Sequence, residues 1–310
     1  MKSYPQSDSP WFRALRYPFL NKQRDFYPRI FNLEKAPDGQ RVHFTTNVNL
    51  KHIDITPHPT LITNLLPSGD NRQIAPVKAY DIKCLTPFGL YEAKRRVPML
   101  AIGSNSSDEQ LNRKFKNAAY RNDMLILPAW LENYSVVYMP LITYYGSVPA
   151  TLCRTPGISA RVTVGFFTVE QARDIIGTES HYAVHRLHDK AIFDDGRSFD
   201  QALAFISGYG VLQNENGRPF QIAEVPHKTQ TEQKTTVLNQ YEIQNTVMRM
   251  IGDQSTSVTA FIQSHLGGQK KRLATTMDLK KRFARILDQQ DHTTLTIKTM
   301  QDPEKNYTPY

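Results

Sequence analysis

Two short stretches of the chain combine residue types that can hold an anion and move a proton. In LAIGSNSSDEQLNRKF, an apolar run ends at Gly103-Ser104-Asn105 and an amphipathic pattern follows at once. Glycine lets a backbone approach a ligand closely, and the first amides of a helix attract carboxylates and phosphates. In TVEQARDIIGTESHY, Glu179 and Tyr182 follow a second amphipathic pattern. A carboxylate such as that of Glu179 is a candidate general acid or base.

Each of these residues also has a purely structural interpretation. A Gly-Ser-Asn turn often only connects a strand to a helix, and Asn105 is a residue type that caps helices. Ser106 and Glu109 have the spacing of a capping box, which predicts a helix start here. Glu179 alone is typical of a surface residue at a helix end. The residue types therefore leave both interpretations open.

The order of the motifs along the chain favours the functional interpretation over the structural one. Between Tyr144 and Tyr182 the chain has a Gly-Ser turn, a Pro-Ala-Thr-Leu strand, a turn at Pro156-Gly157, a β-rich run and a helical pattern that ends in Thr-Glu. Together with Ile102-Gly103-Ser104-Asn105 upstream, this order resembles the γ-glutamylcyclotransferase-like family. The resemblance covers residues 98 to 190, which is less than half of the chain.

The resemblance implies an enzyme that closes a γ-glutamyl amide into 5-oxoproline and releases a free amine or amino acid. The substrate's own α-amine attacks its side-chain carbonyl, so proximity supplies much of the rate and no protein nucleophile or cofactor is implied. By position, Glu179 is the implied general acid and base. The implied substrate-binding residues are Ile102, Gly103, Ser104, Asn105 and Tyr182, with the loop amides holding the substrate carboxylate or the developing oxyanion.

Three features qualify what the resemblance implies. A general acid–base role calls for a raised pKa of Glu179, for which Ile175, Ile176 and Tyr182 are the candidate apolar neighbours. Family members usually carry an aromatic residue, commonly Tyr, where this chain has Ile102. Because Ile102 cannot donate a hydrogen bond, either substrate recognition differs or that contact comes from another part of the chain. The spacing from Glu179 to Tyr182 is also shorter than usual in the family.

Two alternative functions come from other features of the chain. The first is a non-catalytic binding or scaffolding protein on the same fold, suggested by Ile102 and by the long flanks. The second is nucleic-acid association through the basic triplets Lys270-Lys271-Arg272 and Lys280-Lys281-Arg282, although such triplets usually mark a solvated helix face. A metal site at His181, His185 and His188 is disfavoured, because a strand there would point His188 away from the other two. We therefore predict no metal.

The elements that must position these residues predict an α+β fold. We expect a small closed or barrel-like mixed sheet with helices over residues 96–227, a β-rich N-terminal extension over 1–95, and a helical basic region over 228–310. Alternating segments such as RVHFTTNVNL and HIDIT predict strands, and Gly267-Gly268 separates two predicted C-terminal helices. The roles of the two flanks and the oligomeric state stay open.

The composition of the chain limits which classes of protein it can belong to. The chain has 310 residues, of which 40% are hydrophobic, enough to bury a sizeable core. Its N-terminus lacks the apolar block of a signal peptide, and no apolar run approaches the length of a membrane span. Cys84 and Cys153 match no metal or redox spacing. We therefore expect a cytoplasmic protein without membrane association, and a net charge of +9 that is compatible with an anionic partner or with solubility alone.

Overall fold

Three long strands form the centre of the molecule. β7 (Asn122–Tyr138) pairs antiparallel with β8 (Ala150–Phe167), and β8 pairs antiparallel with β6 (Gly89–Ala101). All three are rich in β-branched, aromatic and other apolar residues, which suit a pleated surface buried on one or both faces. The computed structural model describes residues 10–19, 26–35, 41–66, 73–115, 122–179, 181–187, 189–200, 202–230, 235–285, 293–294 and 296–297.

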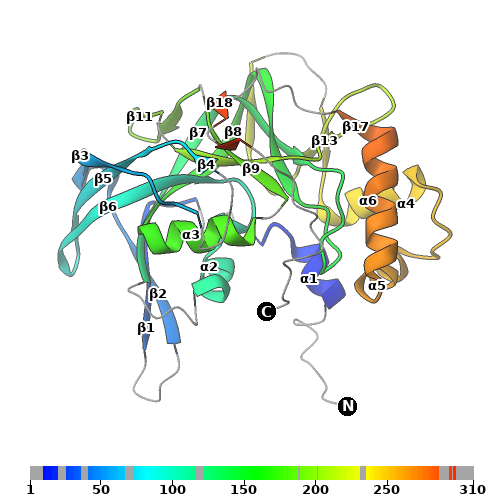
Figure 1. Cartoon of the computed structure of the whole chain (residues 1–310), viewed down its shortest axis with the longest axis horizontal. Helices are drawn as coiled ribbons and strands as arrows, with labels where there is room; N and C mark the ends of the chain where they lie inside the picture. Colours follow the sequence, from blue (N-terminus) through cyan, green and yellow to red (C-terminus); the bar gives the residue numbers. More distant parts are fainter. Residues whose placement is uncertain are drawn as a thin grey trace.

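The main sheet extends on both sides of this centre (Figure 1). Its path runs β11-β10-β7-β8-β6-β12-β9-β18, and side pairings join β1 to β7, β5 to β6, β14 to β7 and β15 to β8. The ladders are antiparallel except those of β12 with β6 and β14 with β16. Among the described residues no ladder joins β11 to β18, so the observed sheet is open and the predicted closed or barrel-like sheet is not confirmed. The mixed α+β class itself is confirmed.

The remaining strands are short or lie towards the ends of the chain. Their bounds are β1 (Arg29–Lys35), β2 (Arg41–Asn47), β3 (Ile53–Ile62), β4 (Gln73–Ile74), β5 (Val77–Thr86), β9 (Tyr182–Arg186), β10 (Ala191–Phe193), β11 (Ser198–Phe199), β12 (Leu203–Ser207), β13 (Val211–Leu212), β14 (Phe220–Ile222), β15 (His227–Thr229), β16 (Thr236–Leu238), β17 (Ala284–Arg285), β18 (Thr293–Thr294) and β19 (Thr296–Ile297).

The helices of the described residues lie at the sides of the sheet (Figure 1). They are α1 (Pro10–Arg16), α2 (Asp108–Phe115), α3 (Val169–Thr178), α4 (Gln240–Met250), α5 (Val258–Leu266) and α6 (Gln269–Phe283), with single 3₁₀ turns η2 (Leu50–His52) and η3 (Ser104–Ser106). The break predicted at Gly267-Gly268 is confirmed, since it separates α5 from α6.

One hydrophobic core draws on all three predicted regions. Ile53 of β3, Val136 of β7 and Phe261 of α5 belong to the same buried cluster. A second cluster lies under α2 and α3 and includes Phe115 and Ile176. Position 95 lies inside β6 and position 227 opens β15, so the flanks share sheet and core with the middle of the chain. This arrangement makes the flanks part of the body that positions the candidate site.

The turn predicted at Pro156-Gly157 is not a turn between strands. Both residues lie inside β8, where the register with β7 shifts between Glu132 and Tyr134. Gly157 has φ +78°, and its amide donates to Asn133 Oδ1 at 3.3 Å. A left-handed glycine that interrupts a ladder is a β-bulge, which bends a long strand without ending it. Sequence alone interprets Pro-Gly as a chain reversal because it shows no pairing partner.

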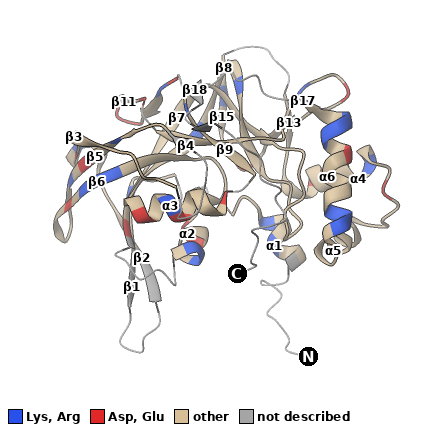
Figure 2. Ribbon diagram, viewed as in Figure 1, with Lys and Arg blue, Asp and Glu red and all other residues tan. Residues whose placement is uncertain are grey.

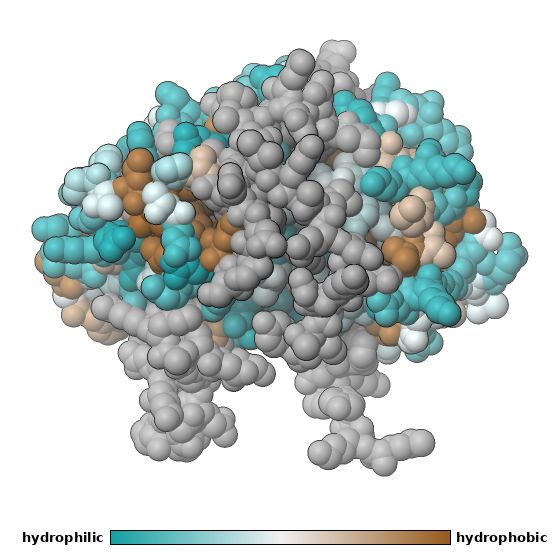
Figure 3. All heavy atoms as spheres, viewed as in Figure 1, coloured by the Kyte–Doolittle hydropathy of each residue, from teal (hydrophilic) through white to brown (hydrophobic). Residues whose placement is uncertain are grey.

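The coloured part of the surface in Figure 3 is mostly hydrophilic, with apolar atoms gathered over β3, β5 and β6 and over α6. Phe88, at the tip between β5 and β6, is 86% exposed, and Leu61, Leu85, Leu90 and Met277 are also exposed. No helix among the described residues is long and apolar enough to cross a membrane.

Candidate functional site

The Gly-Ser-Asn loop follows the buried end of β6. Gly103 precedes η3, in which the Ser106 amide donates to Gly103 O and the Ser107 amide donates to Ser104 O. The first amides of such a turn have no acceptor within it. The Ser106 hydroxyl donates to Ala101 O at 2.8 Å and lies 3.1 Å from the Thr163 hydroxyl. These bonds fix the loop to β6 and β8.

The capping box predicted from Ser106 and Glu109 is not formed. α2 begins at Asp108, and the Ser106 side chain is engaged by Ala101 instead of by the helix. Glu109 points to α1, where Arg16 Nη2 lies 2.9 Å from its Oε2. The predicted helix start is confirmed, since α2 begins at Asp108, but the capping bonds are absent because long-range partners took both side chains.

A buried ion pair holds the start of α2 in place. Arg29 Nε lies 2.9 Å from Asp108 Oδ1, and both side chains are fully buried. Arg29 Nη2 donates to Ser106 O at 2.8 Å, and the Thr45 hydroxyl donates to Asp108 Oδ2 at 3.0 Å. Burial of two charges requires that each find hydrogen-bond partners, and this pair has them. Strand β1 therefore positions both η3 and α2.

Glu179 is presented by the end of α3. A capping box at Thr168 and Gln171 fixes the start of this helix, and Ala172 and Ile176 bury its apolar face. Glu179 is the C-cap residue, and its amide donates to Ile176 O at 3.2 Å. Because the helix stops there, Glu179 lies at the end of α3 and not on its side. α3 lies beside α2 in Figure 1.

The structure brings Glu179 and the loop together. Asn105 Nδ2 donates to Glu179 Oε1 at 2.9 Å, across 74 positions of sequence. Lys114 Nζ from α2 donates to the same oxygen at 2.9 Å and to the Thr178 hydroxyl at 2.8 Å. The Glu179 side chain is only 16% exposed. The acid is therefore held, largely buried, at one side of the Gly103–Asn105 loop.

The electrostatic environment of Glu179 differs from the expected one. Burial raises the pKa of the Glu179 carboxyl. The Lys114 ammonium and the Asn105 amide together lower it by more than burial raises it, so the pKa lies below its ordinary value. Ile175 and Ile176, which were the expected apolar neighbours, are buried in the cluster under α2 and α3. The carboxylate is thus ionised at neutral pH, which is the form that accepts a proton.

Three tyrosines surround the acid and the loop. A Cβ added to Gly103 would lie 2.7 Å from the Tyr17 hydroxyl oxygen, so glycine is needed for this approach. That oxygen accepts from the Ala150 amide at 2.8 Å, and the Tyr182 hydroxyl donates to Ala150 O at 2.9 Å. Burial raises the pKa of Tyr17, Tyr145 and Tyr182, and the charge of Glu179 adds to each rise. All three phenols are therefore neutral near the carboxylate.

Several buried polar atoms of the loop, of the segment around Glu179 and of α1 have no hydrogen-bond partner among the described residues. They include Asn105 Oδ1, His181 Nδ1 and Arg13 Nε. Because Asn105 donates to Glu179 through its nitrogen, its free oxygen is an acceptor. A buried polar atom without a partner is costly, and in native proteins such atoms gather where a ligand or water binds. The site therefore offers acceptors at Asn105 and Glu179 and a donor at Arg13.

Of the predicted site residues, Gly103, Asn105, Glu179 and Tyr182 thus meet in one place, and Ser104 lies in the same loop. Ile102 is partly buried and packs against the main core. Sequence reasoning missed Lys114 and Tyr17. A basic residue in the last turn of the helix that follows the loop was a signal for Lys114. Nothing local marks Tyr17, which is 86 positions before Gly103.

The disfavoured metal site at His181, His185 and His188 falls partly outside the described residues. His181 directly precedes strand β9, His185 lies within it, and His188 lies outside the described residues. No group of three metal-ligating side chains occurs in the described part of the chain. Asp194 is held by both terminal nitrogens of Arg161 at 2.6 Å.

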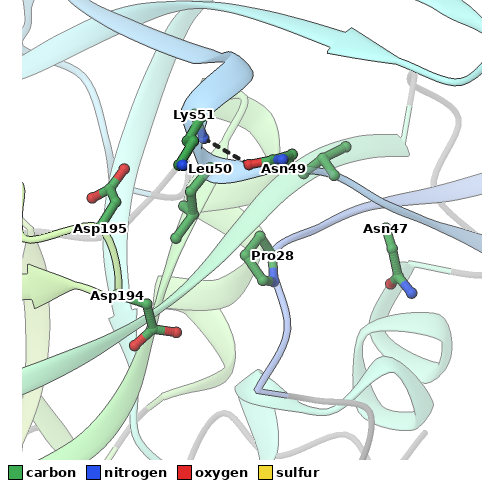
Figure 4. A pocket seen from close by; sticks show the side chains of 8 residues that line it. Pro28, Asn47, Asn49, Leu50, Lys51, Asp194 and Asp195 are labelled. Atoms are coloured by element: carbon green, nitrogen blue, oxygen red, sulfur yellow. Dashed lines mark hydrogen bonds between the residues drawn. The ribbon is translucent and has the colours of Figure 1, made fainter.

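A surface pocket of about 530 Å³ lies elsewhere (Figure 4). Lys51 and Asn49 are joined at its rim by a hydrogen bond from the Lys51 amide, and Asp194 and Asp195 lie opposite. Asp195 pairs with Arg197 at 2.8 Å. Its lining does not include the loop or Glu179, and its carboxylates already have cationic partners, so it offers no comparable chemistry. The other residues that line it are Pro28, Asn47, Val48 and Leu50.

Both basic triplets lie on α6, and four of their six side chains have partners within the chain. Lys271 pairs with Asp253 at 2.9 Å, and Arg272 donates to His265 O at 2.7 Å. Arg282 pairs with Asp278 at 2.8 Å, and the Lys280 ammonium lies 5.2 Å from the Tyr209 ring centroid. These contacts favour the structural interpretation of the triplets.

Comparisons with known proteins add little. No family model matches the chain, and no curated protein matches it. Among solved structures, YkqA from Bacillus subtilis matches with a TM-score of 0.28 and 9% sequence identity, covering 82% of this chain and 96% of that chain. A similarity this weak supports no conclusion about fold or function.

Proposed function

We propose that the protein is a γ-glutamylcyclotransferase-type enzyme that converts a γ-glutamyl amide into 5-oxoproline and a free amine or amino acid. The observation that carries the proposal is the 2.9 Å hydrogen bond from Asn105 Nδ2 to Glu179 Oε1, which joins the two motifs of the resemblance in one buried place. The proposal includes the closed, barrel-like sheet of that family.

The chemistry follows from the charges of the site. Ionised Glu179 accepts a proton from the α-ammonium of the substrate, and Asn105 Oδ1 accepts a second hydrogen bond from the same group. The freed amine then attacks the side-chain carbonyl carbon, and a new C–N bond closes the five-membered ring. Collapse of the tetrahedral intermediate breaks the amide bond as Glu179 gives its proton to the leaving nitrogen. The carboxylate then accepts the second proton from the ring nitrogen and passes it to the released amine, which leaves as an ammonium ion beside neutral 5-oxoproline. No other reactant is consumed.

The loop and the tyrosines would supply binding and orientation. Amides of Gly103 and Ser104 would hold the substrate carboxylate or the developing oxyanion, where fixed donors act on charge as it forms. The curled conformer needed for ring closure is favoured when both ends of the glutamyl group are held. The Tyr17 and Tyr182 rings would limit the space in which the glutamyl chain can extend.

The test is turnover of a panel of γ-glutamyl compounds, with 5-oxoproline scored by mass spectrometry. Loss of a general acid–base group typically costs a factor of about 10² to 10⁴, so we expect Glu179→Gln to lower kcat by at least about a hundredfold. Glu170→Gln changes an exposed glutamate on the same helix and is the matched control, with unchanged turnover expected. Equal activity of the Glu179 variant and the wild type excludes Glu179 from the mechanism.

A second candidate is a non-catalytic binding protein on the same fold. Two observations favour it: Ile102 supplies no hydrogen-bond donor, and Glu179 is already paired with Lys114 at 2.9 Å. On this alternative, the wild type releases no 5-oxoproline from any panel member but still binds γ-glutamyl compounds in calorimetry.

A further inference from the structure

Two arginines, one from α1 and one from α2, share one glutamate, and a third arginine lies nearby on α1. Arg16 Nη2 lies 2.9 Å from Glu109 Oε2, and Arg113 Nη2 lies 3.4 Å from Glu109 Oε1. Both carboxylate oxygens of Glu109 are therefore engaged by these two residues. The third, Arg13, has no ion pair among the described residues. Figure 2 shows the basic positions on both helices.

Arg13 is oriented by aromatic rings instead of by an acid. Its guanidinium carbon lies 4.5 Å from the Tyr145 ring centroid and 5.6 Å from that of Tyr144, so both rings hold it by cation–π contact. Its Nε is buried and without a hydrogen-bond partner in the described part of the chain. Such a guanidinium is fixed and charged but lacks an anion.

Arg13 lies three positions before Arg16 on the same face of α1, and Arg16 shares Glu109 with Arg113, so Arg13 and Arg113 face the same region. Burial lowers the pKa of Arg113, and the charge of Arg13 lowers it further, while Glu109 opposes both. Glu109 is shared by Arg16 and Arg113, so adding Arg13, which pairs with no acid of the described residues, leaves an excess of positive charge. A bound oxyanion would relieve this repulsion and give Arg13 Nε an acceptor, since guanidinium forks bind carboxylates and phosphates with strong charge-assisted hydrogen bonds.

This cationic pair comes from the segments that build the candidate site. Arg113 directly precedes Lys114, which donates to Glu179 at 2.9 Å. Tyr17, four residues after Arg13, lies against Gly103. Tyr145, on which Arg13 stacks, feels the charges of both Arg13 and Glu179: burial raises the pKa of Tyr145 to about 12, Arg13 opposes the rise and Glu179 adds to it. Tyr145 therefore stands in the field of the cation and of the acid.

We infer that Arg13 and Arg113 form an anion subsite beside Glu179 that binds the carboxylate of the ligand's leaving group, and so selects γ-glutamyl amino acids and peptides over γ-glutamyl amines. The assignment to a γ-glutamyl ligand rests on the function proposed above, whereas the anion subsite rests on the arginines alone. Inorganic phosphate has the same recognition chemistry and is a separate arm of the test.

The experiment compares γ-glutamylglycine with γ-glutamylmethylamide, which differ only by one carboxylate. Affinities are measured by calorimetry at constant ionic strength in the Glu179→Gln background, where turnover does not interfere and any effect of that change cancels in the ratio of the two affinities. Arg13→Gln and Arg113→Gln are added singly. Arg282→Gln is the matched control, because Arg282 also stacks on a ring (4.7 Å from Phe283) but is paired with Asp278.

We expect γ-glutamylglycine to bind at least about tenfold more tightly than γ-glutamylmethylamide, in keeping with one charge-assisted bidentate contact. The ratio of the affinities for γ-glutamylglycine and γ-glutamylmethylamide should fall towards one in Arg13→Gln and in Arg113→Gln. It should stay at the wild-type value in Arg282→Gln. Far-UV circular dichroism and urea midpoints confirm folding, and Arg13→Lys, which keeps the charge, should retain part of the preference.

Equal affinities for the two ligands, or a preference that survives in both arginine variants, overturn the inference. Phosphate binding that both variants abolish, without discrimination between the two γ-glutamyl ligands, overturns the carboxylate assignment. A carboxylate preference that depends on the arginines, in a wild type that releases no 5-oxoproline, supports the subsite and contradicts the proposed reaction. The two proposals can therefore fail separately.

Discussion

At the scale of single residues, the charge state of Glu179 is set by its neighbours. Burial and the Lys114 ion pair act in opposite directions on its pKa, and the ion pair with the Asn105 hydrogen bond has the larger combined effect. A group with a lowered pKa in the folded state contributes stability above its unfolded pKa, and this stability is lost as pH falls through the folded pKa. Both activity and stability should thus decline on the acid side.

Lys114→Met tests whether the ion pair with Lys114 outweighs burial in setting the pKa of Glu179. Without the ammonium, burial remains as the largest effect, so the pKa of Glu179 should rise above its value in the wild type. We expect the acid limb of the pH profile of kcat/KM for 5-oxoproline release to move to higher pH. Lys281→Met, on the distant helix α6, is the control for loss of a positive charge. An acid limb at the wild-type position contradicts the assignment of that limb to Glu179.

Tyr17→Phe tests the hydroxyl that lies against Gly103. Burial keeps this phenol protonated, and its proton has no acceptor among the described residues, so it is available to a ligand. We expect kcat/KM for 5-oxoproline release to fall by up to about tenfold, and the free energy of unfolding to fall by about 1–3 kcal/mol because the Ala150 amide loses its acceptor.

The matched control for Tyr17 is Tyr138→Phe, which removes another buried hydroxyl, bonded to Leu238 O at 3.0 Å. This change should lower stability to a similar extent without changing the KM. Equal kinetic effects of the two substitutions show that Tyr17 acts only through folding.

At the scale of elements, the site depends on how three segments are fixed to the sheet. The capping box at Thr168 and Gln171 fixes the start of α3, and the helix then ends at Thr178 so that Glu179 turns aside. The ion pair of Arg29 with Asp108 fixes α2 and η3 against β1. Neither contact touches the proposed substrate, yet both determine where Asn105 and Glu179 lie.

Arg29→Met tests the second of these supports. Removing one partner leaves the Asp108 charge buried without its ion pair to Arg29, a change that typically costs about 3–5 kcal/mol. We expect that loss in urea unfolding, together with a higher KM for γ-glutamyl compounds, because the loop is no longer fixed. The double variant Arg29→Met with Asp108→Leu removes both charges and should recover much of the stability. If the double variant does not recover stability, the buried Asp108 charge is not the cause of the loss in Arg29→Met.

At the scale of the whole molecule, residues outside the resembling segment complete the site. Arg13 and Tyr17 come from the N-terminal region, and α1 itself packs against α5, where Ala14, Val258 and Ile262 form a small cluster. A Cβ added to Gly146 would lie 2.8 Å from Ile262 Cγ2, so the chain just before β8 approaches α5 closely. Both flanks therefore support the same region.

Phe261→Ala tests whether the body unfolds as one unit. Phe261 is fully buried in the core that also contains strands of the middle region, and such truncations cost about 3–5 kcal/mol. We expect one transition for wild type and variant alike, with coincident far-UV circular dichroism and tryptophan fluorescence from Trp11 and Trp130. Separate transitions by the two probes show that the C-terminal helices unfold independently.

Local order in the sequence was enough to place the two helices that flank the candidate site. Apolar spacing placed α2 around Leu111 and Phe115 and placed α3 around Ala172 and Ile176, and these residues are buried as expected. Such patterns suffice because a helix face or a strand face repeats with a fixed period along the chain. The same patterns failed at Pro156-Gly157, where only the pairing with β7 reveals a bulge.

Contacts between distant segments were decided by the tertiary structure. The resemblance, and no local pattern, suggested that Asn105 and Glu179 belong together, and nothing in the sequence brought Tyr17 to Gly103. The direction of the pKa shift of Glu179 also depended on tertiary structure, because Coulomb and hydrogen-bond energies are set by distances in space. Sequence by itself therefore determined which residues could do chemistry, and the fold determined their neighbours and their charge.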